Sequence, residues 1–175
     1  MNGIRVRRQG AREGTSDFMR YFASILPTLR PYAWLISEAM FGLPPEWEQG
    51  YDSVRDRPMG PEWDRFLGYS IAVLDSNSPW TLSLQAPGFV EEYAKFLVDD
   101  WCDIAAVPVG VASPELLQEA AGDLLWRLPE VVVCFSNIDA GPWEFRAREE
   151  TMVNGLRKTL ARRADVETVE LEGPA

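Results

Sequence analysis

The sequence contains no histidine among its 175 residues. Histidine is the commonest general base near neutral pH and the commonest side-chain metal ligand. Its absence excludes the Ser-His-Asp and Cys-His nucleophile pairs and leaves few ways to build a zinc site. Two cysteines, Cys102 and Cys134, cannot form a four-cysteine site and are not in a Cys-x-x-Cys motif. We therefore expect no metal site and no catalytic triad.

Several other common signatures are also missing. The 13 glycines are scattered and form neither a P-loop nor a dinucleotide-binding fingerprint, so we expect no cofactor. No apolar run approaches the length of a membrane span, and no secretory signal is recognisable at the N-terminus. Two cysteines in apolar surroundings do not make a disulfide framework. These absences predict a cytoplasmic protein that binds no membrane.

Charge of one sign dominates the chain. Lys and Arg together number 17 and Asp and Glu 27, which gives a formal net charge of −10. Four arginines fall in residues 1–14, which we expect to be a flexible basic tail, so the body is still more acidic. Such a body repels nucleic acid and favours a basic protein partner, although acidity also serves solubility alone.

Length and composition predict a single folded domain over residues 15–175, because 46% of the residues are hydrophobic and 11% aromatic. Two helices are expected first. Apolar residues recur at helical spacing from Ser16 to Leu26, where Pro27 ends the pattern, and a second helix is expected from Pro31 to Gly42. The remaining pattern mixes strands and helices. Strands are expected at 69–74, 80–85, 104–109, 131–135, 143–147 and 166–171, and helices at 89–97, 113–128 and 149–163.

This order predicts an α+β fold in which two related strand-strand-helix-strand units, residues 68–109 and 130–171, form a mostly antiparallel sheet. The helix over 113–128 bridges them. Ser76-Asn77 followed by Pro79-Trp80 reappears as Ser136-Asn137 followed by Pro142-Trp143, and beyond the Trp the two units align at an offset of 63 residues. A duplication is therefore predicted.

With histidine and cysteine sites excluded, Asp and Glu side chains are the remaining candidates for a functional site. Three acids, Asp99, Asp100 and Asp103, surround Trp101 and could ligate a cation, although an acidic solvated turn is their ordinary explanation. A second group comprises Asp139 in the predicted turn and Glu144 just beyond it. With Trp80 and Trp143 as walls, it would form a ligand pocket between the two units, as in a carboxylate-only enzyme or a small-ligand binding domain. Core packing is the ordinary role of both Trp residues, and Glu144 is expected to face solvent.

Residues 131–152 resemble a pattern found in small bacterial immunity proteins that neutralise polymorphic toxins. The resemblance consists of a hydrophobic strand, an Asn-x-Asp turn at Asn137 and Asp139, and Trp143-Glu144 leading into a second strand. It implies a non-catalytic cytoplasmic protein that blocks a basic toxin domain by direct binding. No motif carries over the toxin-contacting residues of that family. Chemistry alone selects the candidates, because acids attract a basic partner and Trp residues anchor interfaces: Trp47, Trp63, Asp99, Asp100, Trp101 and Asp103.

Overall fold

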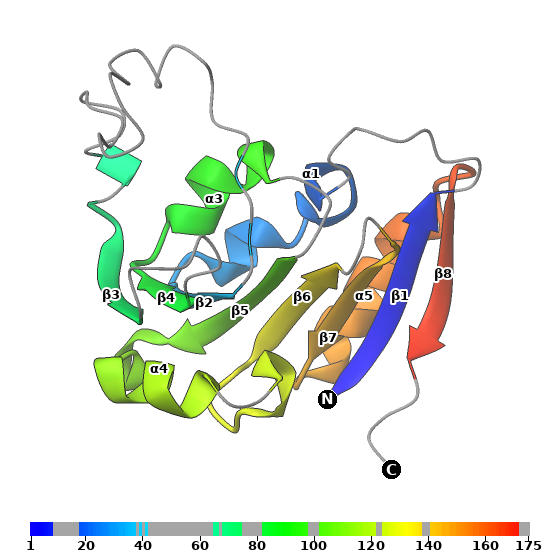
Figure 1. Cartoon of the computed structure of the whole chain (residues 1–175). Coiled ribbons are helices and arrows are strands. Elements are labelled where there is room, and N and C mark those ends of the chain that lie inside the picture. The colour runs from blue at the N-terminus through cyan, green and yellow to red at the C-terminus, as the bar shows by residue number, and fades with distance from the viewer. Residues whose placement is uncertain are drawn as a thin grey trace.

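In the computed structural model of the chain, eight strands form one antiparallel sheet (Figure 1). The described residues are 1–8, 18–37, 39, 41, 65–66, 68–74, 82–97, 102–121, 124–137 and 141–171. The strand order across the sheet is β3-β4-β2-β5-β6-β7-β1-β8. Helices pack against the sheet, so the predicted α+β class with a mostly antiparallel sheet is confirmed.

The elements have the following bounds. The strands are β1 (Asn2–Arg8), β2 (Tyr32–Ser37), β3 (Ser70–Leu74), β4 (Leu82–Gln85), β5 (Cys102–Pro108), β6 (Val133–Asn137), β7 (Trp143–Ala147) and β8 (Val166–Leu171). The α-helices are α1 (Phe18–Phe22), α3 (Phe89–Tyr93), α4 (Pro114–Ala120) and α5 (Glu150–Leu160). Short 3₁₀ helices are η1 (Leu26–Leu29), η3 (Ala94–Phe96), η4 (Val109–Val111) and η5 (Leu125–Arg127).

Each half of the sheet repeats one arrangement. Helix α3 connects β4 to β5, and β2 lies between those two strands; helix α5 connects β7 to β8, and β1 lies between them. A strand inserted antiparallel between two strands that a helix connects is a split β-α-β arrangement. The predicted order strand, strand, helix, strand is therefore present in both halves, as β3-β4-α3-β5 and β6-β7-α5-β8. That the halves arose by duplication stays a prediction.

The predicted offset of 63 residues holds in the helices but not in the strands. Val90 and Val153 are both buried, as are the pair Tyr93 and Leu156. In contrast, Leu82 packs on the α4 side of the sheet, whereas its predicted counterpart Phe145 packs on the other side. Because side chains alternate along a strand, the two hairpins must be offset by one residue more or less than the helices.

The expected flexible tail over residues 1–14 is wrong for residues 2–8, which form β1 between β7 and β8. Ile4 and Val6 are fully buried, while Arg5 and Arg7 project to the other face and pair with Glu144 and Glu167. This alternation of apolar and charged residues is that of a half-buried strand. The four arginines in residues 1–14 suggested a basic tail instead of a strand.

The second N-terminal helix is also wrong, because Tyr32–Ser37 is the strand β2, hydrogen-bonded to β4 and β5. Its four central residues are buried and project to both faces of the sheet. A short apolar run that is buried on both sides has no helical or alternating period to distinguish it. The first predicted helix is shorter than expected, since α1 ends at Phe22 and Pro27 lies inside η1.

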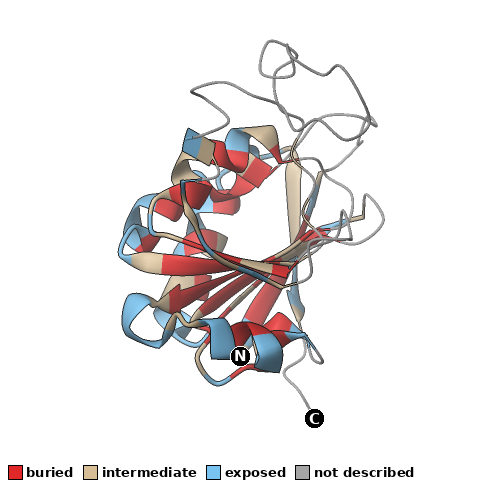
Figure 2. Cartoon of the chain, turned by 60° about the vertical axis from the view of Figure 1, so that its left-hand side comes forward, coloured by how far each residue is buried: buried red, intermediate tan, exposed pale blue. Residues whose placement is uncertain are grey.

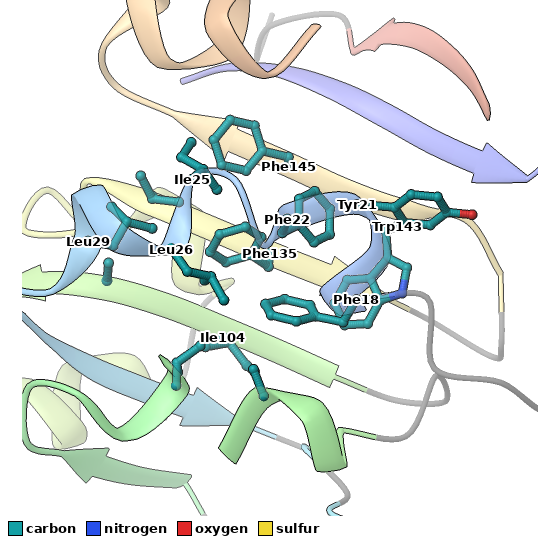
Figure 3. Packing of buried hydrophobic residues seen from close by; sticks show 14 of the residues in the cluster. Phe18, Tyr21, Phe22, Ile25, Leu26, Leu29, Ile104, Phe135, Trp143 and Phe145 are labelled. Atoms are coloured by element: carbon teal, nitrogen blue, oxygen red, sulfur yellow. The ribbon is translucent and has the colours of Figure 1, made fainter. Parts of the chain in front are cut away.

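An aromatic cluster fills the core on the face that α1, α3 and α5 cover. Phe18 and Phe22 of α1 reach onto Phe135 of β6, with Phe22 and Phe135 ring centroids 4.9 Å apart, and onto Trp143 and Phe145 of β7 (Figure 3). The Phe18 and Trp143 centroids are 5.0 Å apart in an edge-on arrangement that aromatic pairs favour. Burial of each such ring contributes about 1.5–3 kcal/mol. Helix α1 is thus held against β6 and β7, the first two strands of the second half.

A second cluster lies on the opposite face, under α4 and η5. It combines Leu35 of β2, Leu84 of β4 and Val107 of β5 with Leu116 and Leu117 of α4. Buried residues consequently run along both faces of the sheet and on the inner sides of the helices (Figure 2). The bridging helix predicted over 113–128 is real but broken into α4 and η5. None of the described helices combines the length and the apolar character that a membrane crossing requires.

Replacement of Gly3 by alanine should destabilise the fold. A Cβ at Gly3 would lie 2.8 Å from the carbonyl oxygen of Phe145 and 2.9 Å from Cγ of Arg146, so the strands must shift. We expect a loss of roughly 1–3 kcal/mol in the free energy of unfolding, measured by urea denaturation. The control is Gly155→Ala in α5, where the added Cβ meets nothing within 4 Å. It should gain roughly 0.5–1 kcal/mol; equal effects of the two changes would contradict the packing at Gly3.

Acid should weaken the contact between α1 and the segment that precedes β8. Hydrogen bonds from Arg163 and Arg20 lower the pKa of Asp165 from 3.8 to about 2. Because the pKa of Asp165 is lower in the folded state, its ion pairs contribute fully to the stability of the fold above about pH 4. This contribution is lost as the pH falls towards 2. The stability difference between the wild type and Asp165→Asn should therefore shrink between pH 5 and pH 2 in urea denaturation. Arg163→Gln should show the same trend, and a pH-independent difference would contradict the assignment.

Candidate functional site

A row of polar side chains crosses the sheet on the face opposite α1, α3 and α5. The register places Ser37 of β2 beside Asp103 of β5, Asp103 beside Ser136 of β6, Ser136 beside Glu144 of β7, and Glu144 beside Arg5 of β1. Paired residues of antiparallel strands project to the same face. We call these five residues the polar row. None of the five is fully buried, so the row is accessible from solvent.

The alternation within β6 and β7 creates the row. Trp143, Phe145 and Phe135 enter the aromatic core, so the intervening residues Glu144 and Ser136 must project to the other face. Neighbouring strands are about 4.8 Å apart, which places Asp103 and Glu144 about 10 Å apart across Ser136. The apolar half of this face lies under α4 and η5, and the row lies beyond it.

Ser136 and Cys134 both donate to the carboxylate of Asp103. The Ser136 hydroxyl forms a short hydrogen bond to Oδ1, and the Cys134 thiol lies 3.6 Å from the same oxygen. Burial raises the pKa of the Cys134 thiol well above its ordinary value, and the negative charge of Asp103 raises it further. The thiol is therefore protonated near neutral pH and is a poor nucleophile.

Glu144 is held by two arginines. Its Oε1 accepts from Arg5 at 2.6 Å and its Oε2 accepts from Arg146 at 3.0 Å. The Arg146 guanidinium also lies over the ring of Trp126, 4.7 Å from its centroid, and the stem of Arg146 crosses the space that Gly3 leaves open. Stacking on an aromatic face and ion pairing fix the position of this cation.

A second accessible surface lies on and around α4. Glu115 and Glu119 project outward from this helix, and three large apolar side chains are exposed at its ends. Val109 and Val111, in η4, are 51% and 41% exposed, and Leu124, which directly precedes η5, is 46% exposed. We call these five residues the α4 surface.

The structure brings together two acids that the sequence assigned to different sites. Asp103 belonged to the predicted partner-binding group and Glu144 to the predicted pocket, yet both lie in the polar row. Glu144 is 23% exposed and ion-paired, so it faces solvent only in part. The other acids and tryptophans of the two groups lie outside the described residues: Trp47, Trp63, Asp99, Asp100, Trp101, Trp80 and Asp139.

The predicted pocket is wrong in one respect. Trp143 is only 1% exposed and packs among the core rings, on the face of β7 opposite to Glu144. A ligand cannot stack on this ring and contact Glu144 at the same time. The ordinary role that the sequence suggested for Trp143, core packing, is the one observed.

Sequence reasoning missed the basic partners of the row, Arg5 and Arg146, and the stacking residue Trp126. The alternation in residues 2–8 and 143–147 was a usable signal for the two arginines, because it places each on the polar face of its strand. No sequence pattern indicated that Trp126 meets Arg146, since they come from separate segments that only the sheet brings together.

The row offers no activated nucleophile of the serine or cysteine type. Ser136 is committed to Asp103, no histidine is available to relay its proton, and the Cys134 thiol is protonated. Within the described part of the chain, no three acids or thiols gather closely enough to hold a metal ion. The charged groups of the row are the carboxylates of Asp103 and Glu144 and the guanidinium group of Arg5.

Loss of the Glu144 charge should cost more stability than loss of the Glu167 charge. Glu144 serves two arginines and is 23% exposed, whereas Glu167 serves Arg7 alone and is 36% exposed. We expect Glu144→Gln to lower the free energy of unfolding by roughly 1–2 kcal/mol and Glu167→Gln to lower it by less. Urea denaturation at low salt measures the free energy of unfolding of both variants without screening the ion pairs. Equal losses would contradict the role of Glu144 as a bridge between Arg5 and Arg146.

Comparison with known proteins gives no relative for this arrangement. No protein family matches the sequence, and neither the curated proteins nor the solved structures include a significant match.

Proposed function

We propose that this chain is a non-catalytic cytoplasmic protein that neutralises a basic bacterial toxin domain by direct binding. The observation that carries the proposal is the excess of acid in the sequence, 27 Asp and Glu against 17 Lys and Arg, which gives a net charge of −10. The resemblance of residues 131–152 to small immunity proteins names the class of partner. Neither a membrane nor a nucleic acid suits a body of this charge.

The ion pairs remove more positive than negative charge from the surface. In the described part of the chain, eight of the 14 basic residues pair with six of the 12 acids. Sharing occurs because Glu144 and Asp165 each bind two arginines. These pairs leave six acids and six basic residues of the described part, so the attraction for a basic partner rests on the net charge of −10 of the whole sequence. Such a charge accelerates encounter with a basic protein.

The alternative is a carboxylate-only enzyme or a small-ligand binding domain with a pocket between the two units. Trp143 lies in the core, so it cannot form the pocket wall that this alternative requires. Asp103 and Glu144 do share a face, but Glu144 is already paired with two arginines and so is poorly placed to act as a base. These facts favour a binding protein.

The test begins with the gene directly upstream of the gene for this chain, which we expect to encode a basic toxin domain. We expect co-expression of the chain to restore growth of cells that this domain kills, and the purified pair to form a 1:1 complex. The association rate, measured by surface plasmon resonance, should fall roughly tenfold or more between about 50 and 500 mM NaCl because salt screens the attraction.

An unrelated acidic protein of similar size and net charge is the control and should neither rescue growth nor bind. A neighbouring gene without a toxic basic domain, or a toxic domain that the chain does not bind, would contradict the proposal. A complex whose association rate ignores salt would contradict its electrostatic basis.

A further inference from the structure

Helix α4 belongs to neither of the two strand-strand-helix-strand units. It connects β5, the last strand of the first unit, to β6, the first strand of the second. The other three described α-helices contribute to the core on the opposite face, whereas α4 packs on the second face against β3 and β4 (Figure 1). One side of α4 is buried in the core, through Leu116, Leu117 and Ala120, and its other side is exposed.

The outer side carries apolar side chains that the core does not use. Three of the six large hydrophobic residues exposed in the described part of the chain, Val109, Val111 and Leu124, flank this one helix of seven residues. Such a helix is about 10 Å long; Val109 and Val111 precede its first residue and Leu124 follows its last. Apolar residues that gather on a surface and are bordered by charge mark binding sites.

The two exposed acids of α4, Glu115 and Glu119, differ in their effect on the stability of the helix. Glu115 lies in the first turn, where a negative charge is favourable, and a hydrogen bond from Ser113 lowers its pKa. Glu119 lies in the last turn, where the helix dipole disfavours an acid, and it follows Glu115 at i+4, a spacing at which like charges repel. No ion pair of Glu119 occurs with a described residue. Its charge is therefore unfavourable to the helix, and its side chain is exposed.

We propose that the α4 surface is where the basic partner docks, with cationic side chains at Glu115 and Glu119 and apolar contacts to Val109, Val111 and Leu124. The assignment rests on the proposed function. Charge complementarity selects the occupant, because an acidic second copy of this chain would meet the two glutamates with its own net charge of −10.

The first variant is Glu119→Lys, which separates binding from folding. A lysine here suits the end of the helix dipole and pairs with Glu115 at i+4, so the urea midpoint should stay equal or rise. Association with the basic domain at low salt should nevertheless slow roughly tenfold. The control is Glu150→Lys on exposed α5 at the other face of the sheet, which makes the same change in net charge. It should leave the association rate within about twofold of wild type.

The second variant, Leu124→Ser, tests the apolar contacts. Its control is Val169→Ser on β8, at the far edge of the sheet, where the side chain is 47% exposed against 46% for Leu124. Dissociation of the complex should accelerate roughly tenfold for Leu124→Ser and stay near wild type for Val169→Ser.

The outcomes separate the two proposals. Wild-type binding with unchanged rates for both α4 variants would overturn the α4 surface and leave the proposed function standing. Equal slowing by Glu119→Lys and Glu150→Lys would show that net charge alone acts, and would also overturn the α4 surface. Absence of binding by the wild-type chain would overturn both.

Discussion

The insertion of an N-terminal strand into each half of the sheet is the constraint on which the rest of the structure depends. β1 supplies backbone hydrogen bonds to both β7 and β8, and β2 supplies them to both β4 and β5. Without β1, the edge strand β8 would have no neighbour in the sheet. Each half is therefore completed by residues far away in the sequence, and unpaired strand edges would be left if either were removed.

This constraint also sorts the two faces. Because β1, β6 and β7 alternate strictly, the rings of Phe135, Trp143 and Phe145 enter one face while Ser136 and Glu144 leave through the other. The aromatic core and the polar row are two consequences of a single register. A slip of one residue would exchange them, so the positions of the charged groups are as firmly determined as those of the core.

Function is best understood through the balance of charges on this scaffold. Arginines form ion pairs with Glu144, Asp165 and other acids of the chain, and these pairs connect strands and helices. Acids are in excess, and some, like Glu119, occupy positions that a stable helix would not choose.

The sequence by itself determined the α+β class, the strands β3 to β8 within a few residues, and the acidic character, because alternation, helical spacing and composition are local properties. Only the tertiary structure decided that Tyr32–Ser37 is a central strand and that Asn2–Arg8 is not a tail. A strand is defined by its neighbours, and those of β1 and β2 lie up to 168 residues away along the chain, as in the pairing of Gly3 with Leu171. The same reason explains the site: Asp103 and Glu144 were recognisable one by one, but their place in a common row, with Arg5 and Arg146 beside them, follows from strand pairing that no local pattern encodes.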